Sequence, residues 1–148
     1  RGSFEGFCSG GGIARLAQAR ALAALQADAP PAFCPTFADL PDITAEKVGA
    51  AAQAGDPLAL AIFETVAYYL GRGLALLVDI LNPERIVIGS IYGRQRALLE
   101  APMLRVLHAE AHPHALAACT IVPAGLGERV GDYAGLAIAQ QVFNQQTS

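Results

Sequence analysis

One stretch of the sequence limits the fold more than any other: a long apolar helical pattern that leads straight into a short apolar run. In "AGDPLALAIFETVAYYLGRGLALLVDILNPERIVIGS", Asp56 and Pro57 form a pair typical of a helix N-cap and first helical position. Apolar side chains then recur every three or four residues as far as Leu81, where an Asn-Pro pair ends the pattern. The spacing predicts a helix over residues 57–81 and a strand over residues 85–90.

A second short apolar run, "CTIVPAG", predicts another strand near residues 119–124. The first run, "RIVIGS", is unbroken and ends in glycine, which is typical of a strand buried on both faces. Helical patterns separate the two runs, and strands separated by helices indicate a parallel, helix-covered sheet. We therefore expect a helix-rich α/β fold. Because two strands make a poor sheet, either two or three strands are missing from this sequence or its periodicity is misleading.

The other segments are mostly helical in pattern. The alanine-rich stretch 12–27 predicts a helix, and the proline-rich stretch 28–44 predicts an irregular surface connection. Thr44 is suited to cap a short helix that follows it. Pro102 marks a kink or a division into two helices within a later helical stretch. We expect Asp132 to cap the terminal helix.

Two glycines, Gly71 and Gly73, interrupt the long helix. Each costs helix stability by roughly 1 kcal/mol relative to alanine. We infer that a neighbouring element approaches the helix closely at these positions. The helical segments also carry more apolar surface than two strands can cover, so we expect a partner.

The composition excludes several classes of protein. Of the 148 residues, 53% are hydrophobic and 16% are charged, so a disordered chain is excluded, and a net charge of -3 without a basic stripe disfavours direct nucleic-acid binding. Cys8, Cys34 and Cys119 lie far apart, which indicates small buried side chains in a reducing compartment. The sequence shows no signal-peptide pattern, and its most apolar stretch is short for a membrane span and carries Asp79. We therefore expect a soluble, cytoplasmic protein without membrane contact.

Common catalytic and metal-binding patterns are weak or absent in the sequence. His108 and His112 have a spacing that would let them share a helical face, but their place before Pro113 favours a solvated helix end. No Ser-His-Asp order, GxxxxGK[ST] loop or GxGxxG fingerprint occurs. What remains are three glycine turns, "SGGG", "IGSIYG" and "AGLGERVG". Such turns suit the approach of a phosphate or nucleotide to a helix N-terminus, and plain turn geometry also explains them.

Taken together, these segments resemble the C-terminal half of the ROK family, which contains bacterial sugar kinases and sugar-responsive transcriptional repressors. The resemblance rests on "GSFEGFCSGGGIARLA", on "AGDPLA … LGRGLALLVDILNPERIVIGS" and on the closing "GDYAGLAIAQQ", and it covers essentially the whole chain. It implies that residues 1–148 form the C-terminal lobe of an actin-like (ribonuclease H-like) ATPase fold, with sugar and ATP bound between two lobes. The family's DxGxT phosphate loop, catalytic aspartate and ExGH sugar segment belong to the N-terminal half and do not occur in this sequence.

The resemblance also implies roles for residues near the start of the chain. Glu5 matches a glutamate that contacts sugar hydroxyls, and a carboxylate is a suitable acceptor for them. Ser3 stands where the family has a zinc-ligating cysteine, so we expect no structural zinc. Gly10, Gly11 and Gly12 match a turn that positions the next helix, with a mainly structural role.

The nucleotide side of the cleft is implied to come from the turns that follow the two strands. "IGSIYG" stands where the family more often has IGGG, so Gly89 is retained whereas Ser90 and Ile91 replace glycines. The implied cofactors are ATP and Mg²⁺. The positions expected to contact the nucleotide are Gly89, Ser90, Gly93, Gly125 and Gly127.

Two functions follow from the resemblance, and a third option stays open. The first is ATP-dependent phosphorylation of a sugar hydroxyl, of a hexose or a related sugar, for which this segment alone is expected to be inactive. The second is a sugar-sensing repressor without kinase activity, whose helix-turn-helix would lie upstream; only then is nucleic acid a partner. The third is a structural domain with a decayed ligand site. Because C-terminal lobes of this family commonly associate, we expect a homo-oligomer through the helical lobe.

Overall fold

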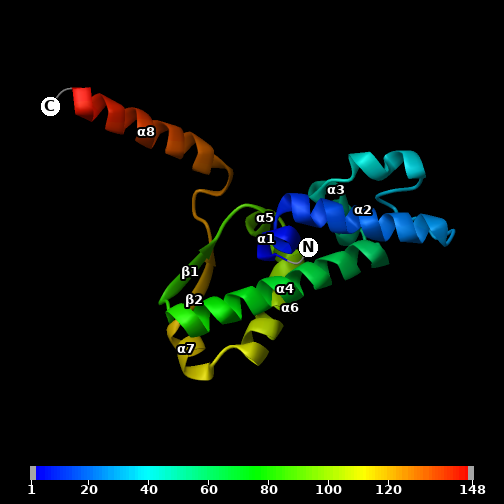
Figure 1. The fold of residues 1–148 in the computed structure, drawn as a ribbon, viewed down its shortest axis with the longest axis horizontal. Coiled ribbons are helices and arrows are strands. Elements are labelled where there is room, and N and C mark those ends of the chain that lie inside the picture. The colour runs from blue at the N-terminus through cyan, green and yellow to red at the C-terminus, as the bar shows by residue number, and fades with distance from the viewer. Residues whose placement is uncertain (1–2, 147–148) are drawn as a thin grey trace.

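The long helix expected from the sequence is the central element of the structure. The computed structural model describes residues 3–146 (Figure 1). Helix α4, Pro57–Leu81, is capped by Asp56, whose Oδ1 atom accepts a hydrogen bond from the Ala59 N–H at 2.8 Å. The helix ends at Asn82, which takes the left-handed conformation with φ 44° and ψ 53°. The predicted bounds of this helix are confirmed.

Seven further α-helices and two 3₁₀ helices accompany α4 in the described part of the chain. The α-helices are α1 (Phe4–Cys8), α2 (Gly10–Gln26), α3 (Ala45–Gln53), α5 (Ile91–Arg94), α6 (Arg96–Glu110), α7 (Pro113–Ala118) and α8 (Val130–Gln146). The 3₁₀ helices are Phe37–Asp42 and Gly127–Arg129. The core lies where α1, α2, α3 and α6 pack against α4.

The two glycines of α4 lie where neighbouring helices approach it closely. A Cβ at Gly71 would fall 2.6 Å from the carbonyl oxygen of Met103 and 2.7 Å from the Cβ of Val106, both on α6. At Gly73, the ring of Phe4 on α1 occupies the place that a Cβ would take. The predicted close approach is confirmed, and it comes from two different helices.

The described residues contain a sheet of two parallel strands, β1 (Arg85–Ile88) and β2 (Thr120–Pro123). The predicted strands and their parallel order are confirmed. The expectation that β1 is buried on both faces is wrong. Ile86 and Ile88 pack against the core, whereas Val87 is 58% exposed because no described segment covers that face of the strand.

Two expected local features differ at helix starts. Gly10–Gly12 do not form a turn between helices. They are the first turn of α2, which Ser9 caps by accepting a hydrogen bond from the Gly12 N–H on its Oγ at 3.0 Å. Asp132 does not cap the terminal helix either, because α8 begins at Val130 and Asp132 lies inside its first turn. A carboxylate in the first turn still interacts favourably with the helix dipole.

The connection 28–44 is more ordered than its prolines suggest. It contains a 3₁₀ helix and buries Phe33, Cys34 and Ile43 in the core. The stretch is therefore not a wholly irregular surface loop. Pro102 neither divides the later helical stretch nor ends it, because α6 continues through this residue.

Helix α8 projects away from the rest of the molecule (Figure 1). Within the described residues it packs mainly against the short 3₁₀ helix that precedes it. Leu136, Ile138 and Phe143 are each more than 60% exposed, with values of 67%, 64% and 65%. This helix therefore leaves an apolar surface open.

Helix α4 is also the helix of the described ranges that is long and apolar enough to cross a membrane. It has 25 residues, and its most apolar window has a mean hydropathy of 1.3 and is 50% buried. A core helix passes the same test, and within the described residues α4 has five helices packed against it.

Candidate functional site

A small hollow, the strand-end crevice, opens where the two parallel strands end. The Ala124 N–H, directly after β2, donates a hydrogen bond to the carbonyl oxygen of Ile88, the last residue of β1, at 2.9 Å. The crevice beyond this pair has a volume of about 380 Å³ and is lined by Ile88, Gly89, Ser90, Gly93, Arg94, Arg96, Pro123, Ala124 and Gly127. In α/β sheets, ligands bind outside the carboxyl ends of the strands. The strand-end crevice lies at this edge of the sheet.

Four of the five positions expected to contact a nucleotide line the strand-end crevice. Gly89, Ser90 and Gly93 come from the segment after β1, and Gly127 comes from the segment after β2. The fifth, Gly125, is not among the lining residues. Two glycine-containing segments that are far apart in the sequence are thus brought to one place by the pairing of the strands.

Ser90 takes a backbone conformation in the strand-end crevice that favours glycine. Its φ is 52° and its ψ is −123°, a combination that residues with a side chain rarely adopt. Such a conformation costs about 1–3 kcal/mol, so the surrounding structure has to hold the residue in place. Strain of this kind is concentrated at ligand sites and switch regions.

Two buried side chains hold the segment after β1. Ile91 is 9% exposed and Tyr92 is 1% exposed. The Tyr92 hydroxyl donates a hydrogen bond to Oε1 of Glu100 at 3.3 Å, and the Arg96 Nε donates to the same oxygen at 2.9 Å. Burial, and then the nearby Glu100, raise the pKa of Tyr92, while the hydrogen bond from Arg96 lowers the pKa of Glu100. Tyr92 therefore stays a neutral donor to a charged acceptor, which anchors the segment.

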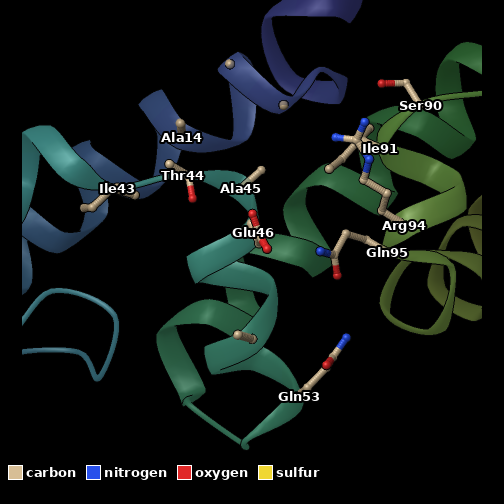
Figure 2. Close-up of a pocket in the computed structure, with 13 residues that line it drawn as sticks. Ala14, Ile43, Thr44, Ala45, Glu46, Gln53, Ser90, Ile91, Arg94 and Gln95 are labelled. Carbon is tan, nitrogen blue, oxygen red and sulfur yellow. The ribbon is translucent and has the colours of Figure 1, made fainter. Parts of the chain in front are cut away.

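A larger hollow, the helix-end cavity, lies beside the strand-end crevice and shares Ser90 and Arg94 with it. Its volume is about 910 Å³, and it is lined by Gly10, Gly11, Ala14, Ile43, Thr44, Ala45, Glu46, Ala50, Gln53, Ser90, Ile91, Arg94 and Gln95. Figure 2 shows the start of α3 on one side of the cavity and the segment 90–95 on the other. The first residues of α2 and of α3 both line it, and helix N-termini attract anions.

Gln95 is a buried polar residue on the wall of the helix-end cavity. It is 7% exposed, and its Oε1 atom has no hydrogen-bond partner within the part of the chain that the structure describes. The amide lies against Gly49 of α3, where a Cβ would fall 2.6 Å from the Gln95 Cδ atom. The sequence reasoning missed this residue. The signal that could have revealed it is its place a few positions after Gly89, the glycine that follows β1.

Glu5 lies on α1, apart from both hollows. Its side chain is exposed and lines neither the strand-end crevice nor the helix-end cavity. Helix α1 is held on α4 by Phe7, whose ring stacks on Tyr69 with the ring centroids 4.0 Å apart. A cavity of about 210 Å³, lined by residues of α1 and by Ser90 among others, lies between this helix and the segment after β1. The sugar-binding role of Glu5 stays a prediction.

Ser3 and Cys8, at the two ends of α1, have structural contacts. The Ser3 Oγ accepts a hydrogen bond from the Gly6 N–H at 3.0 Å and caps the helix. The Cys8 thiol donates to the carbonyl oxygen of Val66 at 3.9 Å, and burial raises its pKa to about 11. Within residues 3–146, no three His, Cys, Asp or Glu side chains come together as metal ligands. The expectation of no structural zinc stays a prediction.

His108 and His112 do not share a helical face. Helix α6 ends at Glu110, and His112 stands at the N-cap position of α7. The His112 N–H donates a hydrogen bond to the Asp79 Oδ1 atom at 2.8 Å. Both histidine side chains are exposed, which agrees with a solvated helix end.

Fold and hollows together define a class of protein: a helix-rich α/β domain with a crevice at the carboxyl ends of two parallel strands. A model of the ROK family matches residues 1–142, and the chain belongs to the ROK family. The chain is similar to the crystal structure of a ROK family glucokinase from Streptomyces griseus in complex with glucose and AMPPNP. The TM-score is 0.69 at 25% identity, over 88% of this chain and 42% of that chain. The expected α/β, actin-like fold class is confirmed.

Relatives of two functional kinds match the sequence. A glucokinase of Halalkalibacterium halodurans is 35% identical over 102 residues, which is 69% of this chain and 31% of that protein. The DNA-binding transcriptional dual regulator NagC of Escherichia coli K12 is 38% identical over 63 residues, which is 42% of this chain and 16% of that protein. The matched regions span less than a third of the length of these relatives.

Proposed function

We propose that residues 1–148 are the C-terminal lobe of a ROK-type sugar kinase and supply the nucleotide side of its active-site cleft. The observation that carries this proposal is the pair of adjoining hollows that share Ser90 and Arg94 at the carboxyl ends of β1 and β2. Hollows at this edge, with two helix starts on their walls, suit a nucleotide with its phosphates. The likeness to a glucokinase solved with AMPPNP supports the same function.

Each hollow suits a different part of ATP. Ile43, Ile91 and Ala14 give the helix-end cavity apolar walls against which a base can pack. In the strand-end crevice, Gly89 leaves the backbone accessible to phosphate oxygens, and Arg94 brings positive charge to the border of the two hollows. Mg²⁺, which accompanies ATP in phosphoryl transfer, supplies neutralisation of the developing charge when bound.

On the sugar side, we assign Glu5 to hold the substrate. Its exposed carboxylate can accept hydrogen bonds from sugar hydroxyls, and charged acceptors make the stronger bonds of this kind. The cavity between α1 and Ser90 puts this helix next to the nucleotide segment. We assign the base that deprotonates the attacking hydroxyl to the N-terminal lobe, so residues 1–148 alone should transfer no phosphoryl group.

A sugar-sensing repressor is the second candidate function. The observation in its favour is the segment after β1, where Ser90 takes a glycine conformation and the Ile91 side chain fills core space. Both changes leave less freedom for phosphates to approach the backbone. The similarity to NagC, a DNA-binding regulator, supports this candidate. Such a protein would bind sugar at Glu5 and DNA through a helix-turn-helix upstream.

Phosphoryl transfer and DNA binding separate the two functions. The protein in its full natural length is mixed with ATP, Mg²⁺ and a panel of hexoses and N-acetylhexosamines, and ADP release is measured. Sugar-dependent ADP release is the result expected of the kinase. The repressor function predicts a different result: calorimetry detects sugar binding without ADP release, and the protein shifts the mobility of promoter DNA from its own operon. That result would contradict the kinase function and support the repressor function. If the protein binds neither sugar nor nucleotide, both proposed functions are overturned.

We further propose that the protein is cytoplasmic, where a sugar kinase meets ATP, and homo-oligomeric. The C-terminal end of α4 exposes a group of large apolar side chains, which supports an association through the helical lobe. They are Leu76, Leu77, Ile80 and Leu81, with exposures of 63%, 41%, 75% and 64%. Light scattering of the full-length protein during size-exclusion chromatography measures the oligomer directly, and a monomer would contradict the proposal.

A further inference from the structure

Gln95 carries a buried polar atom that the fold leaves without a partner. The side chain is 7% exposed, and its Oε1 atom accepts no hydrogen bond within residues 3–146. A buried acceptor without a donor loses its hydrogen bonds to water and gains no hydrogen bond from the protein. Each such group in a native protein therefore needs an explanation.

The local structure does not supply that explanation. Gln95 is the N-cap residue of α6, yet its side chain makes no capping hydrogen bond. Its backbone is fully used: the N–H donates to the Ile91 carbonyl at 2.9 Å, and the carbonyl accepts from the Leu98 and Leu99 N–H groups at 3.0 and 3.1 Å. The turn between α5 and α6 therefore forms without any help from the amide.

The amide lies against α3 on the wall of the helix-end cavity. Gly49 of α3 leaves room for it, because a Cβ there would fall 2.6 Å from both the Cδ and the Oε1 atom of Gln95. Figure 2 shows the Gln95 side chain turned towards α3 among the residues that line the cavity. The Oε1 atom itself has almost no accessible surface, so the amide has to turn away from Gly49 into the cavity to contact a ligand there. A ligand that offers a hydrogen-bond donor favours this turn, because the oxygen then gains the partner that it lacks.

The chemistry of an amide narrows the choice of ligand. A glutamine offers one acceptor and one donor side by side, which complement the N6 amino group and the N7 atom of adenine. Guanine and hypoxanthine have an oxygen in place of the amino group, so the same edge presents two acceptors. The Oε1 atom then meets an acceptor and stays unsatisfied.

We propose that Gln95 reads the base of the bound nucleotide and makes the site selective for adenine through hydrogen bonds to N6 and N7. The inference rests on the proposed function, because it takes the helix-end cavity as the nucleotide site. The apolar walls, Ile43 and Ile91 among them, receive the faces of the base, and Gln95 recognises its edge.

The first test changes the ligand and leaves the protein intact. Isothermal titration calorimetry of the full-length protein compares ADP with IDP, which carries an oxygen where adenine has the amino group. We expect ADP to bind about tenfold more tightly or better, the range of discrimination by one bidentate contact. 7-Deaza-ADP, which keeps the amino group and lacks N7, is expected to fall between the two. Equal affinities for ADP and IDP would overturn the proposal.

The second test changes the protein. Gln95→Leu replaces the amide by an apolar side chain of similar size, so the variant is expected to melt at or above the wild-type temperature and to bind ADP and IDP equally. Gln53→Leu is the matched control, because Gln53 is a glutamine that lines the same cavity but is exposed. It should keep the wild-type preference. A Gln95→Leu protein that still prefers ADP as wild type does would contradict the role of Gln95.

The outcomes distinguish this inference from the proposed function. If the full-length protein binds neither ADP nor IDP, the nucleotide site is wrong and the role of Gln95 falls with it. If the protein phosphorylates sugar and uses ATP and ITP with equal affinity, the kinase function stands and the role of Gln95 alone is overturned.

Discussion

The backbone of Gly49 and the amide of Gln95 lie against each other where α3 meets the segment after β1, so close that a Cβ on Gly49 would fall 2.6 Å from the Gln95 Cδ atom. Gly49 is itself one of the buried residues of α3. The contact sets both the packing of α3 and the position of the Gln95 amide, which is the buried amide among the described residues that line the helix-end cavity.

The first prediction concerns this contact. Gly49→Ala should push the Gln95 amide out of place, lower the free energy of unfolding by about 1–3 kcal/mol, and weaken ADP binding. Gly135→Ala is the control, because Gly135 lies in α8 with nothing within 4 Å of a Cβ, so alanine should stabilise the helix there. Urea denaturation and calorimetry measure both effects. Unchanged stability and affinity in Gly49→Ala would contradict the contact.

The second prediction ranks the two glycines of α4. At Gly71 a Cβ meets the backbone carbonyl of Met103, which cannot rotate away, whereas at Gly73 it meets the ring of Phe4, a side chain that is 48% exposed. Gly71→Ala should therefore cost about 1–3 kcal/mol of stability, and Gly73→Ala should cost less. Denaturation midpoints of the two variants give the comparison. The reverse order would show that α1 is held more rigidly than α6.

The third prediction concerns the strained backbone of Ser90. Ser90→Gly should raise the free energy of unfolding by about 1 kcal/mol or more, because glycine adopts φ 52° and ψ −123° without a steric cost. Asn82→Gly serves as the control. Asn82 also has a positive φ, of 44°, but in the left-handed region that asparagine tolerates, so little change is expected. Equal effects at the two positions would argue against strain at Ser90.

The fourth prediction concerns sugar binding. Glu5→Gln in the full-length protein should weaken sugar affinity by about 1 kcal/mol, because a neutral amide oxygen accepts a weaker hydrogen bond than a carboxylate does. The side chain is exposed, so thermal stability should stay near that of wild type. Glu64→Gln, an exposed carboxylate on α4 that pairs with Arg105 at 3.3 Å, should leave sugar binding unchanged. Wild-type sugar affinity in Glu5→Gln would remove this residue from the site.

The fifth prediction is a dependence of stability on alkaline pH. Burial raises the pKa of Cys8 from 9.0 to about 11. Between these values the thiol of the unfolded chain ionises while the folded protein keeps its proton, so the unfolded state gains stability as the pH rises. The free energy of unfolding should fall through this window, and Cys8→Ala should flatten the fall. Cys119→Ala should not, because Cys8 is still present.

A pH series of urea denaturation curves under reducing conditions measures this dependence for the wild type and both variants. The comparison of variants isolates Cys8 from the other groups that titrate at alkaline pH. A fall of the same steepness in wild type and Cys8→Ala would show that the thiol is not buried against α4.

Capping residues and the spacing of apolar residues predict the helices and strands of this chain well. These signals are strongest in the long helices. Asp56 and Pro57 mark the start of α4, an Asn-Pro pair marks its end, and the structure places both bounds where the sequence does. The burial of β1 could not be predicted in the same way. An unbroken apolar run predicts that a strand is buried, but it does not say which segments bury it. Whether Val87 is covered depends on the segments that lie over it.

The candidate site was predictable only in part for a similar reason. Glycines after strands are visible in the sequence, so Gly89 and Gly127 are found, and parallel pairing brings them together. Gln95 carries no periodic signal, and its importance comes from Gly49, a residue far away in the sequence. A buried, unpaired amide is a property of the packed structure. The actin-like fold, by contrast, follows from the family to which the sequence belongs.

The pairing of β1 with β2 sets an order of events for the chain as it folds. Arg85 pairs with Thr120, 35 positions later, and α5, α6 and α7 lie between them. Closing so long a loop costs entropy before the strand contacts repay it, whereas α4 and α6 already meet along their length. We expect the helices to assemble first and the strands to pair last. The floor of the strand-end crevice is then the last part of this chain to form and the first to open. A ligand bound there would stabilise the paired ends of the two strands and so the folded chain.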